Sequence, residues 1–314
     1  MTPKSNKKHY SAKNRHQNPR KTGADRSFAG DKISRDQTRK RTSPRSQATI
    51  SRYKTTPTPP QNGYFIWGRH AVFAALANPE RRIQQIYVLT ESTGELERVL
   101  NKVNSQRRAE IPRAKIVDRT CLDGIGGIGE KAVHQGIAAA VWPLNSPHLD
   151  TFLEGINHSC DKKNSEPVRL LLLDQISDPR NFGAIMRSAR AFDVTGVITT
   201  KRNAANENGV LARAASGALD HLPLLRVVNL SRAIEQLRKN GFFVAGLAGD
   251  GNTDVSSLRQ HKHLAIILGA EGNGLRRLSR DHCDMLVRIN INNDADSLNV
   301  SIAAAIALYA ANVK

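Results

Sequence analysis

Two arginines and an asparagine occur in a segment that follows an apolar run and has the pattern of a helix. Residues 170–173 are four consecutive leucines, which predict a buried strand. The residues Asp178, Pro179 and Asn181 are typical of a helix start. A helix over 182–192 places its apolar residues on one side: Phe182, Ile185, Met186, Ala189 and Phe192. It places Gly183, Arg187 and Arg190 on the other side, where an anionic ligand could approach, although the two arginines could equally be solvated surface charge.

A second polar loop, residues 268–275, follows another apolar run and contains three glycines around Glu271. Glycine permits positive φ and a close approach of the backbone to a ligand. The spacing of these glycines differs from that of dinucleotide-binding and P-loop motifs, so a tight turn and a cofactor loop are equally compatible with it. A carboxylate beside a strand end favours a partner for Glu271, which could be a ligand hydroxyl, an amine or an arginine.

A third loop precedes the last helical pattern, residues 298–312. We expect Ser297 to cap this helix, and Asn299 and Ser301 add further polar groups near its start. One side of the predicted helix is apolar and carries Leu298, Ile302, Ile306, Tyr309 and Val313. The remaining positions are rich in alanine, which permits close packing against another helix or a loop.

Strand and helix patterns alternate over the whole region that carries the three loops. Strands are predicted at 168–174, 194–199, 224–228, 242–247, 264–268 and 285–291, and helices at 182–192, 207–216, 230–240, 275–282 and 298–312. This alternation is typical of an α/β fold with a mainly parallel sheet covered by helices on both faces. Ligands of such sheets bind beyond the carboxyl ends of the strands, where all three loops lie.

Ahead of this region, the pattern predicts three further parts. Residues 63–142 have strand patterns at 83–89 and 137–142 and helical patterns at 71–76 and 95–103, which indicate a small α/β domain. Residues 143–166 are polar and contain prolines, which indicates a linker to the domain 167–314.

The chain has 314 residues and a net charge of +19, and the charge is concentrated at its start. Residues 1–62 are basic and nearly free of large apolar side chains, so we expect a disordered arm that binds nucleic acid through phosphates, or else a solubilising tail. The three cysteines are far apart, which predicts neither a disulfide framework nor a metal site. The sequence has no apolar run of membrane-spanning length and no signal peptide, and we expect a cytoplasmic protein without membrane contact.

Taken together, the three loops resemble the three signature motifs of the SpoU (TrmH) family of RNA ribose 2′-O-methyltransferases, within the SPOUT superfamily. The first matching segment spans 181–192, the second 268–275 and the third 297–303, in the order and spacing of the family. Residues 66–142 resemble the L30e/L7Ae-like RNA-binding domain of the subgroup that modifies large-subunit ribosomal RNA. This similarity rests on residues 68–72 and 134–137.

The resemblance implies methylation of a ribose 2′-hydroxyl in ribosomal RNA, at a guanosine of the 23S molecule, with S-adenosyl-L-methionine as cofactor. It also implies a trefoil-knotted sheet, a homodimer formed through the methyltransferase domain with a contribution from the final helix, and a bacterial cytoplasmic location. The implied catalytic residues are Arg187, Asn181, Glu271 and Asn299. The implied cofactor-binding residues are Gly269, Ile289, Ile291, Leu298 and Ser297. The chain departs from the family pattern at 290–296, which has neither proline nor glycine and carries two acids.

By this resemblance, Arg187 acts on the reacting 2′-hydroxyl. A guanidinium is almost never neutral, so we favour stabilisation of the developing alkoxide over proton abstraction. Three other functions stay open: a methyltransferase of transfer RNA, a non-catalytic RNA-binding factor of ribosome assembly, and a nucleotide-binding enzyme of ordinary doubly wound fold.

Overall fold

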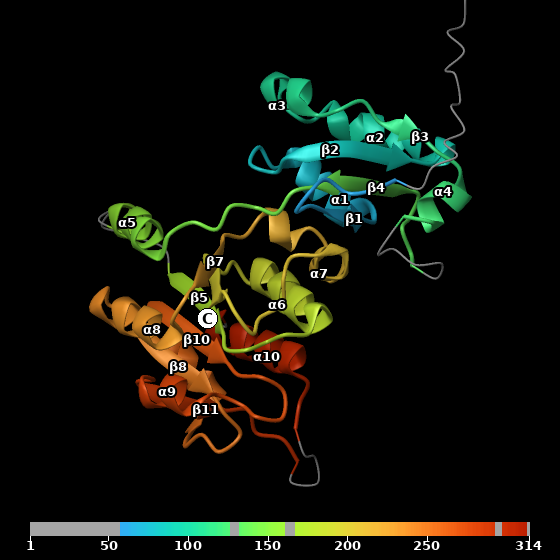
Figure 1. The fold of residues 1–314 in the computed structure, drawn as a ribbon. Helices are drawn as coiled ribbons and strands as arrows, with labels where there is room; N and C mark the ends of the chain where they lie inside the picture. The colour runs from blue at the N-terminus through green and yellow to red at the C-terminus, as the bar shows by residue number, and fades with distance from the viewer. Residues whose placement is uncertain (1–56, 126–131, 161–166, 293–296, 313–314) are drawn as a thin grey trace, which may run out of the picture. The chain divides into compact units, whose positions relative to one another are not determined.

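The computed structural model describes residues 57–125, 132–160, 167–292 and 297–312 (Figure 1). The predicted basic arm, residues 1–62, lies almost entirely outside these ranges. Among the described residues, no helix combines the length and the apolar character that crossing a bilayer requires.

The first domain is built on a four-stranded sheet in the order β1-β4-β2-β3. Its strands are β1 (Tyr64–Trp67), β2 (Ile83–Val88), β3 (Lys115–Ile116) and β4 (Ile137–Val141). Its helices are α1 (Arg69–Ala77), α2 (Thr93–Leu100), α3 (Ser105–Glu110) and α4 (Arg119–Asp123), and a 3₁₀ turn, η1, spans Thr90–Ser92. The predicted strands and helices of this domain are all present, and β1, β3, α3 and α4 are additional to them.

The second domain contains a seven-stranded sheet in the order β7-β6-β5-β10-β8-β11-β9, and every pair of neighbours is parallel. Its strands are β5 (Val168–Leu173), β6 (Gly196–Thr200), β7 (Leu224–Val227), β8 (Phe243–Leu247), β9 (Thr253–Asp254), β10 (His263–Leu268) and β11 (Met285–Arg288). The prediction of a parallel sheet is confirmed.

Helices cover both faces of this sheet (Figure 1). They are α5 (Leu149–Cys160), α6 (Pro179–Ala191), α7 (Gly209–Ala215), α8 (Leu230–Lys239), α9 (Arg277–Asp281) and α10 (Val300–Asn312), with 3₁₀ turns η2 (Ala218–Asp220) and η3 (Val255–Gln260). The four leucines of β5 alternate between the faces. Leu171 and Leu173 belong to the core that contains α6, α7 and α10, whereas Leu170 and Leu172 belong to the core that contains α5 and α8.

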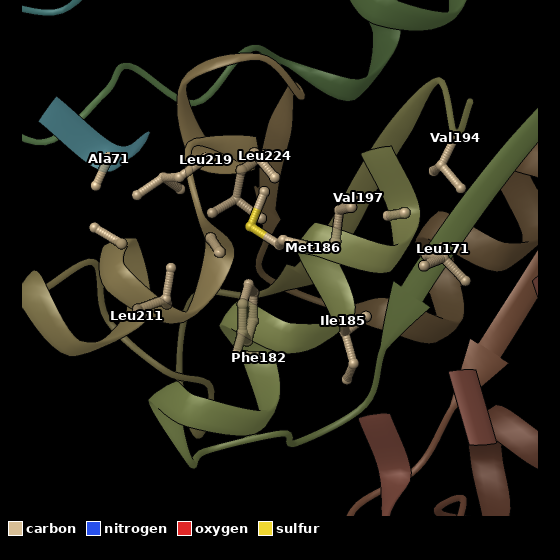
Figure 2. Close-up of a cluster of buried hydrophobic side chains, with 14 of the residues drawn as sticks. Ala71, Leu171, Phe182, Ile185, Met186, Val194, Val197, Leu211, Leu219 and Leu224 are labelled. Carbon is tan, nitrogen blue, oxygen red and sulfur yellow. The ribbon is translucent and has the colours of Figure 1, made fainter. Parts of the chain in front are cut away.

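Helix α6 is central to the first of these cores (Figure 2). Its predicted apolar side is correct, because Phe182, Ile185 and Met186 are completely buried there. The interpretation of Gly183 as part of an open, basic side is wrong. A Cβ at Gly183 would lie 2.5 Å from the carbonyl oxygen of Leu211, so the glycine allows α6 and α7 to pack closely.

The segment expected to be a linker contains helix α5. The side chains of Leu149, Leu153 and Ile156 are buried in the core on the α8 face of the sheet. They recur at the spacing of one helical face, so this segment is held on the sheet by apolar burial.

The two domains are joined by a buried ionic contact. The guanidinium of Arg81, from the first domain, donates from Nε to Asp220 Oδ1 at 2.6 Å and from Nη1 to Glu207 Oε2 at 3.3 Å. The Arg81 side chain is fully buried, and the two carboxylate side chains are 3% and 8% exposed. Tyr64 also donates to Glu207, at 2.9 Å.

Helix α10 packs through its small residues, as its alanine content suggests. Ile302 and Tyr309, from the apolar side of the predicted helix, are 53% and 62% exposed. The buried side is made mainly of small residues: Val300, Ala304, Ala307, Leu308 and Ala311. Small side chains allow α10 to approach α6 and η3, which it contacts after the chain has returned from β11 across the sheet.

Candidate functional site

The three predicted loops meet through the side chain of Asn299. Its Nδ2 donates to Asn181 Oδ1 at 3.0 Å and to Glu271 Oε1 at 2.7 Å. The backbone N–H of Val300 also points to Glu271 Oε1, at 3.4 Å. Three of the four predicted catalytic residues therefore form one hydrogen-bonded group, which we call the Asn181–Glu271–Asn299 cluster.

Each member of the cluster is placed by the end of a helix or a strand. Asn181 lies in the first turn of α6, whose N-terminus is capped by the Asp178 carboxylate accepting from the Arg180 N–H at 2.9 Å. Glu271 follows β10. Asn299 precedes α10, and its Oδ1 accepts from the Ser301 N–H at 2.9 Å, so Asn299 rather than the expected Ser297 caps this helix.

The glycine-rich loop after β10 is both a tight turn and a cavity wall. The Gly274 N–H donates to the Ala270 carbonyl at 2.9 Å, and Gly272 and Gly274 have φ of 79° and 61°. A Cβ at Gly269 would lie 2.1 Å from the carbonyl carbon of Gly274, so only glycine fits there. Glu271 has partners, as expected, but they are the Asn299 amide and the Val300 N–H, not a ligand hydroxyl, an amine or an arginine.

A cavity of about 560 Å³ adjoins the cluster and contains all five predicted cofactor-binding residues in its wall. Four of its lining residues are glycines, and several others are apolar. The lining residues are Leu247, Ala248, Gly249, Leu268, Gly269, Ala270, Glu271, Gly272, Gly274, Ile289, Ile291, Ser297, Leu298, Asn299, Val300 and Ala303. Pockets for small molecules commonly enclose about 300–1,000 Å³.

A second cavity, of about 440 Å³, lies beside the first and shares with it Ala270, Glu271 and Val300. Its other lining residues come from the ends of β5 and β6, the start of α6 and the loop after β10: Gln175, Ile176, Ser177, Asp178, Asn181, Asn203 and Asn273. Glu271 therefore lines both cavities, which lie at the carboxyl ends of the strands.

Arg187, the fourth predicted catalytic residue, is exposed and has no hydrogen bond or ion pair with another described residue. It follows Asn181 by six positions, or about 240° around a helix at about 100° per residue. Arg190 is exposed too and lies near His221, whose pKa is lowered by burial and further by the Arg190 charge. The contacts of Glu271 and Asn299 therefore include Asn181 and do not include Arg187.

Asp174 supports the loops of the site through its contacts, and the sequence patterns did not indicate it. It follows β5, is 1% exposed, and accepts from Arg276 Nε and Ser279 Oγ, both at 2.6 Å. These contacts fix the segment after the glycine-rich loop against the end of β5. The available signal was an aspartate directly after four leucines, because a carboxylate at the end of a buried strand is seldom left unpaired.

Comparison with known proteins assigns both domains. Residues 169–309 match the SpoU rRNA methylase family, and residues 65–147 match the RNA 2′-O ribose methyltransferase substrate-binding domain. The chain is 36% identical over 249 residues to a 23S rRNA (guanosine-2′-O-)-methyltransferase, RlmB, of Xylella fastidiosa, which covers 79% of this chain and 95% of that protein. The enzyme of the same name from Xanthomonas campestris is 33% identical and covers 80% of this chain and 96% of that protein.

The fold is also that of solved family structures. The SpoU methyltransferase AviRb of Streptomyces viridochromogenes, in complex with the cofactor AdoMet, superimposes with a TM-score of 0.63 at 21% identity, covering 80% of this chain and 89% of that one. The matches to both domains and the identity over four fifths of the chain lead to one assignment. This chain belongs to the SpoU rRNA methylase family.

Proposed function

We propose that this protein transfers a methyl group from S-adenosyl-L-methionine to the ribose 2′-hydroxyl of a guanosine in 23S ribosomal RNA. The observation that carries the proposal is the position of the Asn181–Glu271–Asn299 cluster at the boundary of two cavities. Group transfer between two bound molecules needs two adjoining sites, because the reacting atoms must be held close and aligned.

The larger cavity suits the cofactor. Its glycines leave backbone N–H and C=O groups accessible, and Leu247, Ile289 and Leu298 provide apolar surface for an adenine ring and a methionine chain. The glycines match binding by main-chain groups, since a side chain at Gly269 would collide with the turn itself. When bound, S-adenosyl-L-methionine would supply an electrophilic methyl group on a positively charged sulfur.

The residues of the cluster hold the loops of the site in a fixed orientation. Asn299 fixes the Glu271 carboxylate and the Asn181 amide with two hydrogen bonds from one nitrogen, which holds the shared wall rigid. Alignment of two reactants can lower the barrier by roughly 7–11 kcal/mol. We assign to Arg187 the electrostatic stabilisation of the oxygen as its proton leaves, with the proton passing to solvent or an RNA phosphate.

The substrate is proposed from the relatives and from the first domain. The two relatives named above act on guanosine in 23S rRNA, and the domain at 65–147 belongs to a family of substrate-binding domains for RNA. The high positive charge of the chain suits a polyanionic partner. A ribosomal substrate places the protein in the bacterial cytoplasm, and the basic arm is proposed to add phosphate contacts.

A homodimer is part of the proposal. Ile302 and Tyr309 form an exposed apolar side on α10, and Phe192 contacts the Tyr309 ring edge-on at 6.3 Å. An exposed apolar patch of this kind is typical of an interface. Equilibrium sedimentation of the wild type and of Tyr309→Lys tests it, with a dimer expected for the first and a monomer for the second.

Two experiments test the function. Equilibrium binding should show affinity for S-adenosyl-L-methionine and none for NAD or ATP; the reverse result would indicate a nucleotide-binding enzyme. Mapping of 2′-O-methyl groups in ribosomal and transfer RNA, with and without the gene, should show one 23S guanosine losing its methyl group. A lost methyl group in transfer RNA, or none at all, would favour the alternative substrate or the assembly factor.

The variant Arg187→Ala tests the assignment of that residue. It should abolish methyl transfer and leave cofactor affinity nearly intact, because Arg187 does not line the larger cavity. A folded variant that no longer binds the cofactor would assign Arg187 to the cofactor site instead.

A further inference from the structure

The smaller cavity has a composition that distinguishes it from the cofactor cavity. Four of its lining residues carry amide side chains: Gln175, Asn181, Asn203 and Asn273. It contains two carboxylates, Asp178 and Glu271, and no lysine, arginine or histidine. Amides both donate and accept hydrogen bonds, whereas carboxylates only accept.

Most of these amides have no partner within the described part of the protein. The side chains of Gln175, Asn203 and Asn273 make no hydrogen bond to another described residue, although each lines the cavity. Asn181 uses its Oδ1 to accept from Asn299, which leaves its Nδ2 for another partner. Four amide side chains with free hydrogen-bonding groups thus line a cavity of about 440 Å³.

The backbone of this cavity is also unusual. Gln175 has φ of 61°, in the left-handed region that residues with a Cβ seldom adopt, and Asn203 has φ of 58°, which asparagine adopts more readily than most residues. Gln175 directly follows the buried Asp174 at the end of β5, which is anchored to Arg276 and Ser279. Strained residues of this kind are often found at ligand sites, where the surrounding structure holds them in place.

From these observations we propose that the smaller cavity receives the base of the target nucleotide, turned out of its RNA helix or loop, and that Gln175, Asn203 and Asn273 determine which base is methylated. This inference rests on the proposed function, since it places the base next to the ribose at Glu271. Proteins that act on one nucleotide commonly read an unstacked base through hydrogen bonds to its edges.

The charges of the cavity favour guanine. A phosphate would meet two carboxylates and no cation there, so the cavity does not suit the RNA backbone. The Watson–Crick edge of guanine presents two adjacent N–H donors and a carbonyl acceptor. The carboxylate and amide oxygens can accept from the donors, and an amide N–H₂ can donate to the carbonyl. Adenine offers only one donor group on the same edge, which leaves the acceptors of the cavity without partners.

The test uses nearly isosteric variants, Gln175→Met and Asn273→Leu, which keep the size of each side chain and remove its hydrogen bonds. The control is Asn252→Leu, an exposed amide in the loop after β8 that lines neither cavity. The full chain is assayed with labelled S-adenosyl-L-methionine on a 23S rRNA fragment that carries guanosine, inosine or adenosine at the mapped position. Thermal melting confirms that each variant is folded.

We expect the wild type and the control to prefer guanosine over adenosine, and each cavity variant to lower kcat/KM for guanosine about tenfold to a hundredfold. The preference over adenosine should shrink in proportion, while the KM for the cofactor is unchanged. Equal loss on all three RNAs, or an unchanged preference, would overturn the assignment of the base. A wild type that binds the cofactor and methylates none of the RNAs would instead refute the proposed function.

Discussion

The replacement of the fully buried Arg81 by methionine should strongly destabilise the protein. Methionine keeps the length of the side chain and removes the cation from between Asp220 and Glu207, whose side chains are 3% and 8% exposed. Burial is the largest single influence on the pKa of Arg81 and would lower it, but Asp220, Tyr64 and Glu207 together raise the pKa above its usual value, so the wild-type residue is charged. The pKa of Tyr64 is raised by burial and then by Glu207, so its hydroxyl remains a donor.

Removing one partner of a buried ion pair costs about 3–5 kcal/mol, because the other charge is left in the interior without a counter-ion. Two carboxylates lose their cation here, so the loss should fall in the upper part of that range. The assay is urea unfolding followed by circular dichroism and by tryptophan fluorescence, at pH 7.5. The two probes should give one common transition in the wild type, since residues of both domains belong to one buried core.

The neighbouring Arg82→Met is the matched control. Arg82 is exposed and lies over the Trp142 ring at 4.6 Å, a contact worth about 0.5–1 kcal/mol at such a site. The triple change Arg81→Met, Glu207→Gln and Asp220→Asn should recover much of the stability, because no buried charge is left unpaired. If Arg81→Met lowers the free energy of unfolding no more than Arg82→Met does, the buried network does not hold the domains together and the reasoning is refuted.

Two glycine substitutions test the close packing of α6 against α7, and the reactivity of Cys283 tests its burial. Gly183→Ala should lower the free energy of unfolding by about 1–3 kcal/mol, because its Cβ would meet the Leu211 carbonyl at 2.5 Å. Gly155→Ala, with open space around the new Cβ, should raise the free energy of unfolding by up to about 1 kcal/mol. Equal effects of the two changes in urea unfolding would disprove the close contact. Burial raises the pKa of Cys283 to about 12, so iodoacetamide at pH 8 should modify it at least about a hundredfold more slowly than an unfolded thiol, with a rate still rising at pH 9. A plateau near pH 9, seen by mass spectrometry of the modified peptide, would show an ordinary thiol.

Local patterns predicted most elements of the second domain, because their apolar residues form either a helical period or a continuous buried run. The α6 helix and the leucines of β5 are examples, since their apolar residues are buried as expected. The α10 helix shows the limit of this method. Hydrophobic periodicity shows only that Ile302 and Tyr309 share one apolar side, whereas the close approach to α6 buries the alanines and leaves these two large residues exposed.

Other features depend on partners far along the chain, which local patterns do not reveal. Arg81 is an ordinary charged residue in the sequence, and its carboxylate partners follow more than a hundred positions later. Gly183 lies beside arginines on a helical projection, yet its position is decided by the approach of α7. For the site, residue types and order indicated Asn181, Glu271 and Asn299, but only the fold shows that one amide nitrogen joins them.

The central claim is that the Asn181–Glu271–Asn299 cluster forms the shared wall of a methyl-transfer site. It is tested most directly by incubating the purified chain with S-adenosyl-L-methionine and unmethylated 23S rRNA, digesting the RNA to nucleosides and measuring 2′-O-methylguanosine by mass spectrometry. The wild type should form it, and Asn299→Leu, which removes both hydrogen bonds to the cluster, should lower the rate at least about a hundredfold while remaining folded. An undiminished rate for Asn299→Leu, or a methyl group on a base instead of a ribose, would contradict the account.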